Sequence, residues 1–232
     1  MGIIQRGIGK LEIGIYLEFG ICNLGFRVLA MRVISGTSKG RRLVTPKNQG
    51  LRPTSDRVKE SVFNILGEIV EEKVVLDLFA GTGNLGIEAL SRGARRAIFV
   101  EKGRQAVRLI QRNLAQCGMD GRSEIIPKDV NRAIGILKQR GESFDLILMD
   151  PPYERGLILR TLEKLTSYKI YHEDSILVIE HDRREPLPEI VRGWNLIRQR
   201  KIGDTTLSFL TPRSEGPMDK DEMEYESPLS PL

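Results

Sequence analysis

Between residues 74 and 210 the chain alternates between short apolar runs and longer segments whose apolar residues recur at helical spacing. Such alternation is typical of an α/β fold, in which helices connect the parallel strands of a doubly wound sheet. We expect a mostly parallel, Rossmann-like sheet of seven strands, at residues 74–78, 97–101, 123–126, 144–149, 175–180, 195–201 and 205–210. We expect helices at residues 85–92, 105–116, 130–139 and 156–165. Ligands of such folds bind at the carboxyl ends of the strands, which is where the site residues are sought.

A glycine-rich segment follows the first of these strands. It reads Gly81-Thr82-Gly83-Asn84-Leu85-Gly86 and leads into the first helix of the sheet. Glycines allow a ligand to approach the backbone, and the start of a helix offers free N–H groups. The spacing also matches the Gly-x-Gly-x-x-Gly pattern of dinucleotide-binding proteins. The pattern alone therefore leaves two cofactors open, a nicotinamide dinucleotide and a methyl donor.

Acidic residues near three successive strand ends favour the methyl donor. Asp77 precedes the glycine loop, where it would repel a pyrophosphate and suit the amino-bearing end of S-adenosylmethionine. Glu101 is placed to accept hydrogen bonds from ribose hydroxyls, and Asp129 from an adenine amine. We therefore predict an S-adenosylmethionine site. Its predicted residues are Asp77, Phe79, Ala80, Gly81, Thr82, Gly83, Gly86, Glu101, Lys102, Asp129 and Val130.

The segment Asp150-Pro151-Pro152-Tyr153 directly follows the fourth strand of the expected sheet. Its prolines fix the backbone and remove two N–H donors, which leaves carbonyls and the Asp150 carboxylate as acceptors. An exocyclic base amine has two N–H donors, so these acceptors would orient its nitrogen toward the methyl group. Tyr153 would stack on the extruded base, and stacking of about 1–3 kcal/mol per base is of the size that offsets extrusion. We predict that all four residues are catalytic.

Basic residues cluster before the first strand of the sheet. Residues 32–57 hold seven lysines and arginines against one acid, Asp56, in a chain whose formal net charge is +5. Clustered positive charge attracts phosphate backbones, although a solvated basic surface has the same composition. We expect a short hairpin from residues 33–36 and 41–44, and a helix that begins near Asp56. The candidate RNA-binding residues are Lys39, Arg41, Arg42, Arg52, Thr54 and Arg57.

The two ends of the chain differ from the middle. Charges interrupt the apolar, glycine-rich residues 1–30 too often for a membrane span, and no signal-peptide core is present. One hypothesis is that translation starts at Met31. Residues 214–232 hold six acids and one lysine and are expected to be disordered. We thus expect an atypical extension at 1–30, a basic RNA-binding segment at 31–70, a catalytic domain at 71–213 and the acidic tail.

Cysteine and histidine usage indicates the cellular setting. Cys22 and Cys117 are too few and too far apart for a disulfide framework or a metal site, which fits a reducing cytoplasm. No second group of ligand residues surrounds His172 or His181. We expect no metal, no membrane association and a monomer.

Four segments carry a resemblance to a known family. They are residues 36–43, residues 51–60 (Leu-Arg-Pro-Thr-Ser-Asp-Arg-Val-Lys-Glu), the glycine loop with residues 88–93, and residues 150–153. Over residues 31–213 the chain resembles the RsmD family of 16S rRNA guanine-N2 methyltransferases. The resemblance implies a guanine amine of small-subunit rRNA as the target, presented by a partly or fully assembled 30S particle. It also implies that residues 52–57 lie over the donor and acceptor sites.

Three rival functions remain, of which the third belongs to a different class. A DNA adenine-N6 methyltransferase would use the same chemistry, but it usually resembles an Asn-Pro-Pro pattern and carries a target-recognition domain. A nicotinamide-dependent oxidoreductase conflicts with Asp77 and with the proline pair. A catalytically silent ribosome-assembly factor would have little need to keep Asp77, Glu101 and Asp150.

Overall fold

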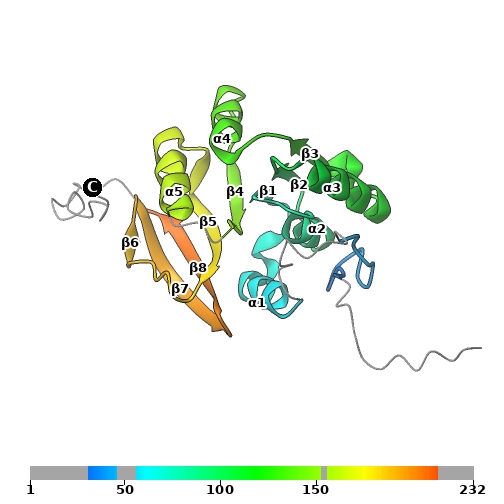
Figure 1. Ribbon diagram of the computed structural model, residues 1–232, viewed down its shortest axis with the longest axis horizontal. Helices are drawn as coiled ribbons and strands as arrows, with labels where there is room; N and C mark the ends of the chain where they lie inside the picture. Colours follow the sequence, from blue (N-terminus) through cyan, green and yellow to red (C-terminus); the bar gives the residue numbers. More distant parts are fainter. Residues whose placement is uncertain (1–30, 46–55, 153–155, 214–232) are drawn as a thin grey trace, which may run out of the picture.

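The computed structural model describes residues 31–45, 56–152 and 156–213, and Figure 1 shows helices on both faces of its sheet. The sheet has eight strands in the order β3-β2-β1-β4-β5-β8-β7-β6. The strands are β1 (Val74–Leu78), β2 (Arg96–Val100), β3 (Ser123–Ile126), β4 (Phe144–Met149), β5 (Tyr171–Asp182), β6 (Ile190–Val191), β7 (Trp194–Ile202) and β8 (Thr205–Pro212). The helices are α1 (Asp56–Leu66), α2 (Asn84–Ser91), α3 (Arg104–Cys117), α4 (Val130–Gln139) and α5 (Leu157–Tyr168), with 3-10 turns η1 (Gly67–Val70) and η2 (Asp120–Arg122).

The sheet confirms the expected doubly wound α/β class. Strands β1 to β5 are parallel, and β8 pairs antiparallel with β5. The strand order reverses at β1, which lies between β2 and β4, so the carboxyl ends of these strands border the usual ligand crevice. The strand number is eight rather than the expected seven. The additional strand, β6, has only two residues, which is too short for a periodic pattern.

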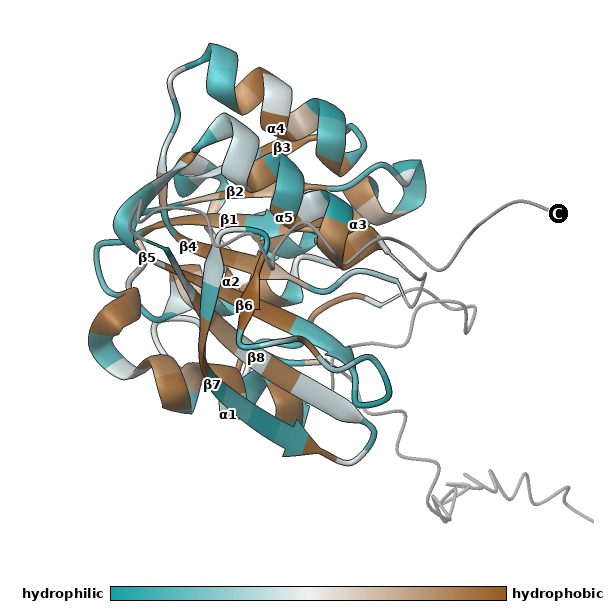
Figure 2. Cartoon of the chain, turned by 90° about the vertical axis from the view of Figure 1, so that its left-hand side faces the viewer, coloured by the Kyte–Doolittle hydropathy of each residue, from teal (hydrophilic) through white to brown (hydrophobic). Residues whose placement is uncertain are grey.

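The two faces of the sheet carry different helices. Val75 and Leu148 pack on the side of α1, α2, α3 and residues 31–45, which we call the α1–α3 face. Leu76 and Ile147 pack on the opposite side, against α4 and α5. Burial on both sides explains why the central strands read as continuous apolar runs. Figure 2 shows these strands as mainly hydrophobic between helices with hydrophilic outer sides.

Most element bounds lie within two residues of the expectation. The strands β1, β3 and β4 and the helix α4 begin and end where the sequence pattern predicts. Strand β5 begins four residues earlier than the predicted Ser175, at Tyr171. Its exposed first residues are polar, and a β-bulge interrupts its pairing with β4 there, so the apolar pattern starts late. None of the helices formed by the described residues has the length and apolarity to cross a membrane.

Residues 31–45 form the expected hairpin, joined by an isolated bridge between Arg32 and Arg42. The N–H of Val33 donates to the Arg41 carbonyl at 2.9 Å. The turn rests on the end of α2, because a Cβ on Gly36 would lie 1.7 Å from the Ser91 carbonyl oxygen. Gly36 also has a φ of 80°, so both its conformation and its contact require glycine.

A buried ion pair joins this hairpin to α1 and α2. Lys59 of α1 and Glu88 of α2 have fully buried side chains, with 3.2 Å between Nζ and Oε2. The Glu88 carboxylate also accepts the N–H groups of Ile34 and Ser35, at 2.8 and 3.0 Å, and the Nε–H of Arg92 at 2.9 Å. A buried charge needs this many partners, because removing one partner leaves the other charge without compensation.

We predict that Lys59→Met lowers the free energy of unfolding by about 3–5 kcal/mol, because it leaves the Glu88 carboxylate buried without its main cation. Urea unfolding of the variant measures the loss. The matched control is Lys138→Met at an exposed position of α4, which should change stability by less than about 0.5 kcal/mol. Equal stability of the two variants would contradict the structural role of the ion pair.

Candidate functional site

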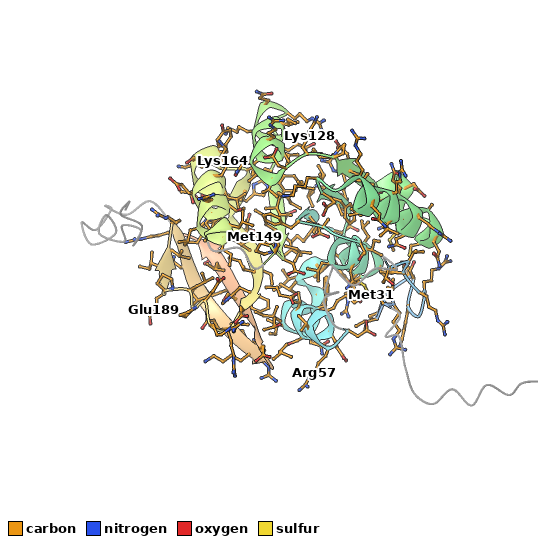
Figure 3. All side chains as sticks on the ribbon, viewed as in Figure 1. Met31, Arg57, Lys128, Met149, Lys164 and Glu189 are labelled. Carbon is orange, nitrogen blue, oxygen red and sulfur yellow. The ribbon has the colours of Figure 1, made fainter. Side chains whose placement is uncertain are left out.

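Three of the predicted segments meet at the carboxyl edge of the sheet. The last residue of β1, Leu78, is aligned with Val100 of β2 and with Met149 of β4. The glycine loop, Glu101 and Asp150 directly follow these aligned residues. Figure 3 shows Met149, the last residue of β4, near the centre of the molecule.

The glycine loop adopts left-handed backbone conformations. Phe79, Gly81 and Gly83 have φ values of 61°, 56° and 78°. Left-handed φ is uncommon for a side chain such as that of Phe79, and such residues often occur at functional sites. The N–H of Ala80 donates to the Val100 carbonyl at 3.0 Å, which holds the turn against β2. The loop is thus a fixed cradle at the start of α2.

Asp77 and Gly86 join the strand before the loop to the helix after it. The Asp77 Oδ2 accepts the N–H of Gly86, in the first turn of α2, at 2.9 Å. A Cβ on Gly86 would lie 2.3 Å from the Phe99 ring and 3.0 Å from the same carboxylate oxygen. The last glycine of the motif is therefore required for close packing of helix, strand and carboxylate.

Asp77 is a buried acid among other acids. Burial raises the pKa of its carboxyl group to about 7, the Gly86 hydrogen bond opposes the rise, and the charges of Asp150 and Glu101 add to it. The residue Asp77 is only 2% exposed to solvent. An environment of this kind favours a cationic ligand, whose charge would stabilise the ionised carboxylate. The contact predicted between Asp77 and the amino-bearing end of the donor stays a prediction.

Glu101 holds the glycine loop from the next strand. Its Oε2 accepts the N–H of Gly81 at 2.9 Å, and its Oε1 accepts the N–H of Gly103 at 2.6 Å. An ionised carboxylate has about four acceptor positions, so these two bonds leave capacity for ribose hydroxyls. The role of Glu101 toward a ribose stays a prediction, and its contacts add a structural role that the sequence pattern did not indicate.

Asp129 caps α4. Its Oδ1 accepts the N–H of Arg132 at 3.1 Å, and its Oδ2 lies 3.5 Å from the Arg132 guanidinium. Its side chain is 45% exposed and follows β3 at the same edge. The next residue, Val130, is buried, whereas Lys102 is exposed. The adenine contact predicted for Asp129 stays a prediction beside this capping role.

Asn113 of α3 connects the glycine loop to the basic hairpin. Its amide oxygen accepts the Val44 N–H at 2.7 Å, and its amide nitrogen donates to the Thr82 carbonyl at 3.0 Å. The hydroxyl of Thr82 also contacts the Met31 sulfur at 3.9 Å. Lys59 makes a second connection through a 2.7 Å hydrogen bond to the Asn84 side chain. The hairpin and the loop are therefore held as one unit.

Asn113, Lys59 and Glu88 are functional residues that the sequence patterns do not indicate as part of the site. One signal was available for the first two. Asn113 follows Ile110 at helical spacing, and Lys59 lies at helical spacing from Val62 and Phe63, so each is a polar residue on an apolar helix face. A fully buried amide or ammonium at such a position needs specific partners.

The proline segment lies beside β5. Asp150 is half-buried, Pro151 is buried and Pro152 is exposed, while Tyr153 lies outside the described residues. Because Met149 is aligned with Ile179, Asp150 lies next to the buried Glu180 of β5. The backbone carbonyls and carboxylates gathered here are acceptors, which suits a ligand that brings N–H donors.

The candidate RNA-binding residues within the described chain lie at the surface. Lys39, Arg41, Arg42 and Arg57 are exposed, and Figure 3 shows Arg57 pointing outward from α1. The Arg41 guanidinium donates to the Gln116 carbonyl at the end of α3, so it has a structural contact as well. Arg52 and Thr54 lie outside the described residues.

The chain is similar in structure to a protein described as a methyltransferase. The structure titled "Putative methyltransferase yhhF from Escherichia coli" superposes with a TM-score of 0.70 at 32% identity, and the match covers 80% of this chain and 99% of that chain. The shared architecture is a mostly parallel α/β sheet with an antiparallel hairpin at its carboxyl-terminal end.

Sequence comparisons define the family. The family described as "Conserved hypothetical protein 95" matches residues 31–211. "Putative rRNA methyltransferase YlbH" of Bacillus subtilis is 38% identical over 183 residues, covering 79% of this chain and all of that protein. "Ribosomal RNA small subunit methyltransferase D" of Escherichia coli is 32% identical over 191 residues, covering 82% and 94%. The chain therefore belongs to the RsmD family of methyltransferases.

We predict that Asp77→Asn removes a pH-dependent destabilisation. The folded-state pKa of Asp77 is raised to about 7 from 3.8, so the folded protein holds a proton that the unfolded chain releases. The stabilisation that protonated Asp77 contributes to the folded state is fully present below pH 3.8. It decreases by about 1.4 kcal/mol per pH unit above that value and is lost near pH 7. Urea unfolding at pH 5 and pH 7 should show the variant losing less stability than the wild type. Parallel losses in the two proteins would refute the shifted pKa.

Proposed function

We propose that the chain transfers a methyl group from S-adenosylmethionine to the exocyclic N2 amine of a guanine in 16S rRNA. The observation that carries the proposal is the convergence of the glycine cradle, the buried Asp77 and the Asp150 segment at one edge of the sheet. Family membership supports methyl transfer, and the relative from Escherichia coli supports small-subunit rRNA as the substrate. A reducing cytoplasm, where ribosomes assemble, is the proposed setting.

The donor fits the residues that are present. The loop turns through the positive φ values of Phe79, Gly81 and Gly83, and a Cβ on Gly81 would meet only the Phe79 carbonyl oxygen, at 3.9 Å, so there is open space beside the backbone for a ligand. Asp77 and Glu101 supply acceptors where the amino group and ribose hydroxyls of the donor would lie. When bound, the donor supplies an electrophilic methyl group on a cationic sulfur. Asp77 would be ionised by that nearby positive charge.

Asp150 and the carbonyls of the proline segment would bind the guanine amine. Accepting both N–H groups orients the nitrogen lone pair toward the methyl carbon. Held in this way, the amine nitrogen would bond to the methyl carbon as the bond between that carbon and the donor sulfur breaks, and the amine would lose one proton to Asp150 or to water. Asp150 thus positions the nucleophile in either case.

The direct test supplies radiolabelled S-adenosylmethionine with unmodified 30S particles, protein-free 16S rRNA or duplex DNA. We expect labelled N2-methylguanosine from rRNA, and a loss of at least about 100-fold in Asp150→Ala, because correct placement of the reacting atoms carries much of the acceleration. Asp174→Asn, at the exposed opposite end of β5, is the matched control and should retain activity.

Each other result identifies a rival. Label in DNA adenine would overturn the substrate and keep the reaction. Tight donor binding without transfer to any of the three substrates would favour the catalytically silent assembly factor. Equal activity of Asp150→Ala and Asp174→Asn would remove Asp150 from the mechanism.

We also predict that the basic hairpin and α1 contact phosphates. Arg42→Gln combined with Arg57→Gln should weaken rRNA binding and reduce the slope of log affinity against log salt by about 1.5, since each lost contact with a phosphate removes about 0.7–0.9. Filter binding over a salt series measures the slope. Arg41 is left intact because it also contacts α3. A wild-type slope in the variant would show that these two side chains do not contact RNA.

A further inference from the structure

The second half of β7 is an exposed basic strand. Arg198, Arg200 and Lys201 are all exposed, and among the described residues none of them pairs with an acidic side chain. Strand β6 pairs only with Trp194 and Asn195, so within the described part of the chain the second half of β7 has a paired strand, β8, on one side only. Figure 2 shows it as a hydrophilic stretch near α1.

The strand register places this basic segment at the edge that carries the candidate site. Asp182, at the end of β5, is aligned with Thr205, and Thr205 is aligned with Ile202 of β7. Because β8 runs antiparallel to both neighbours, the end of β7 lies at the same edge as the ends of β4 and β5. The arginines are therefore near the catalytic edge rather than at the far side of the sheet.

One row across the sheet connects Asp150 to Arg200. Asp150 lies beside Glu180, Glu180 is aligned with Leu207, and Leu207 is aligned with Arg200. The row crosses three strand spacings of about 4.8 Å, so the two Cα atoms lie about 14 Å apart. A base held at Asp150 would leave its neighbouring nucleotides within reach of an extended arginine.

The arginines project from the α1–α3 face of the sheet. Aligned residues of antiparallel strands point to the same face, and Arg198 and Arg200 are aligned with Phe209 and Leu207. Both partners pack in the core of the α1–α3 face. The basic hairpin packs on this face too, on the other side of β4 from β7, as Figure 1 shows. Positive charge thus flanks the proposed base pocket on two sides.

We propose that Arg198 and Arg200 form a second phosphate-binding strip, which holds the rRNA backbone on the side of the target guanine opposite the hairpin. The proposal rests on the proposed function and extends its RNA interface. Arginine suits phosphate through its planar set of donors. The two side chains are about 6.8 Å apart along the strand, a spacing suited to successive phosphates of an extended chain. Phosphate contacts position the RNA, and the pocket selects the base.

The test compares two charge-matched double variants of the full chain. Arg198→Gln with Arg200→Gln removes the strip, and Arg95→Gln with Lys138→Gln removes two exposed charges at the opposite edge of the sheet. Binding of unmodified 16S rRNA is measured over about 50–200 mM salt, and methyl transfer is measured alongside. We expect the strip variant to reduce the salt slope by about 1.5 and to raise KM with kcat unchanged, while the control keeps the wild-type slope and KM.

The outcomes separate this proposal from the proposed function. A wild-type slope and KM in the strip variant, with methyl transfer to rRNA intact, would overturn the strip alone. The same result accompanied by dimers in sedimentation would assign the arginines to protection of an unpaired strand edge. Failure of the wild-type protein to bind or methylate rRNA would overturn the proposed function and the strip together.

Discussion

The buried carboxylate of Glu88 organises the part of the molecule on which the candidate site depends. It accepts two N–H groups of the hairpin, pairs with Lys59 of α1 and accepts the Nε–H of Arg92, the residue that follows α2. The hairpin, α1 and α2 are thus joined by the single buried charge of Glu88. The glycine loop leads directly into α2, and the basic hairpin is consequently fixed against that loop.

Glu88 and Asp77 show how one fold uses two buried carboxylates differently. Glu88 has a lysine and an arginine beside it, so its charge is compensated within the protein. Asp77 has a backbone N–H as partner and two further acids nearby, and burial raises its pKa to about 7. The protein supplies no cation at that second carboxylate in the described chain. A cationic methyl donor would supply the positive charge that compensates the Asp77 carboxylate, and this requirement links the structure to the proposed chemistry.

Much of the fold follows from sequence because burial on both faces gives the parallel strands a clear signal. The bounds of β1, β3 and β4 are readable as apolar runs, and the glycine loop is readable from its motif. The polar beginning of β5 and the two-residue β6 carry no such periodicity. Side-chain partners are harder still: the capping role of Asp129 and the bridge made by Asn113 depend on segments that meet only after folding. The acidic site residues are predictable from sequence because the ends of parallel strands converge at one edge of the sheet. The position of the β7 arginines near that edge follows only from the strand register in the structure.

A crystal structure with bound S-adenosylhomocysteine is the most direct test of the central claim that donor and acceptor meet at the carboxyl edge of β1 and β4. The account predicts ribose hydroxyls within hydrogen-bonding distance of the Glu101 carboxylate, the amino group near Asp77, and the sulfur directed toward Asp150. A ligand bound away from the glycine loop, or with its sulfur directed away from Asp150, would contradict the account.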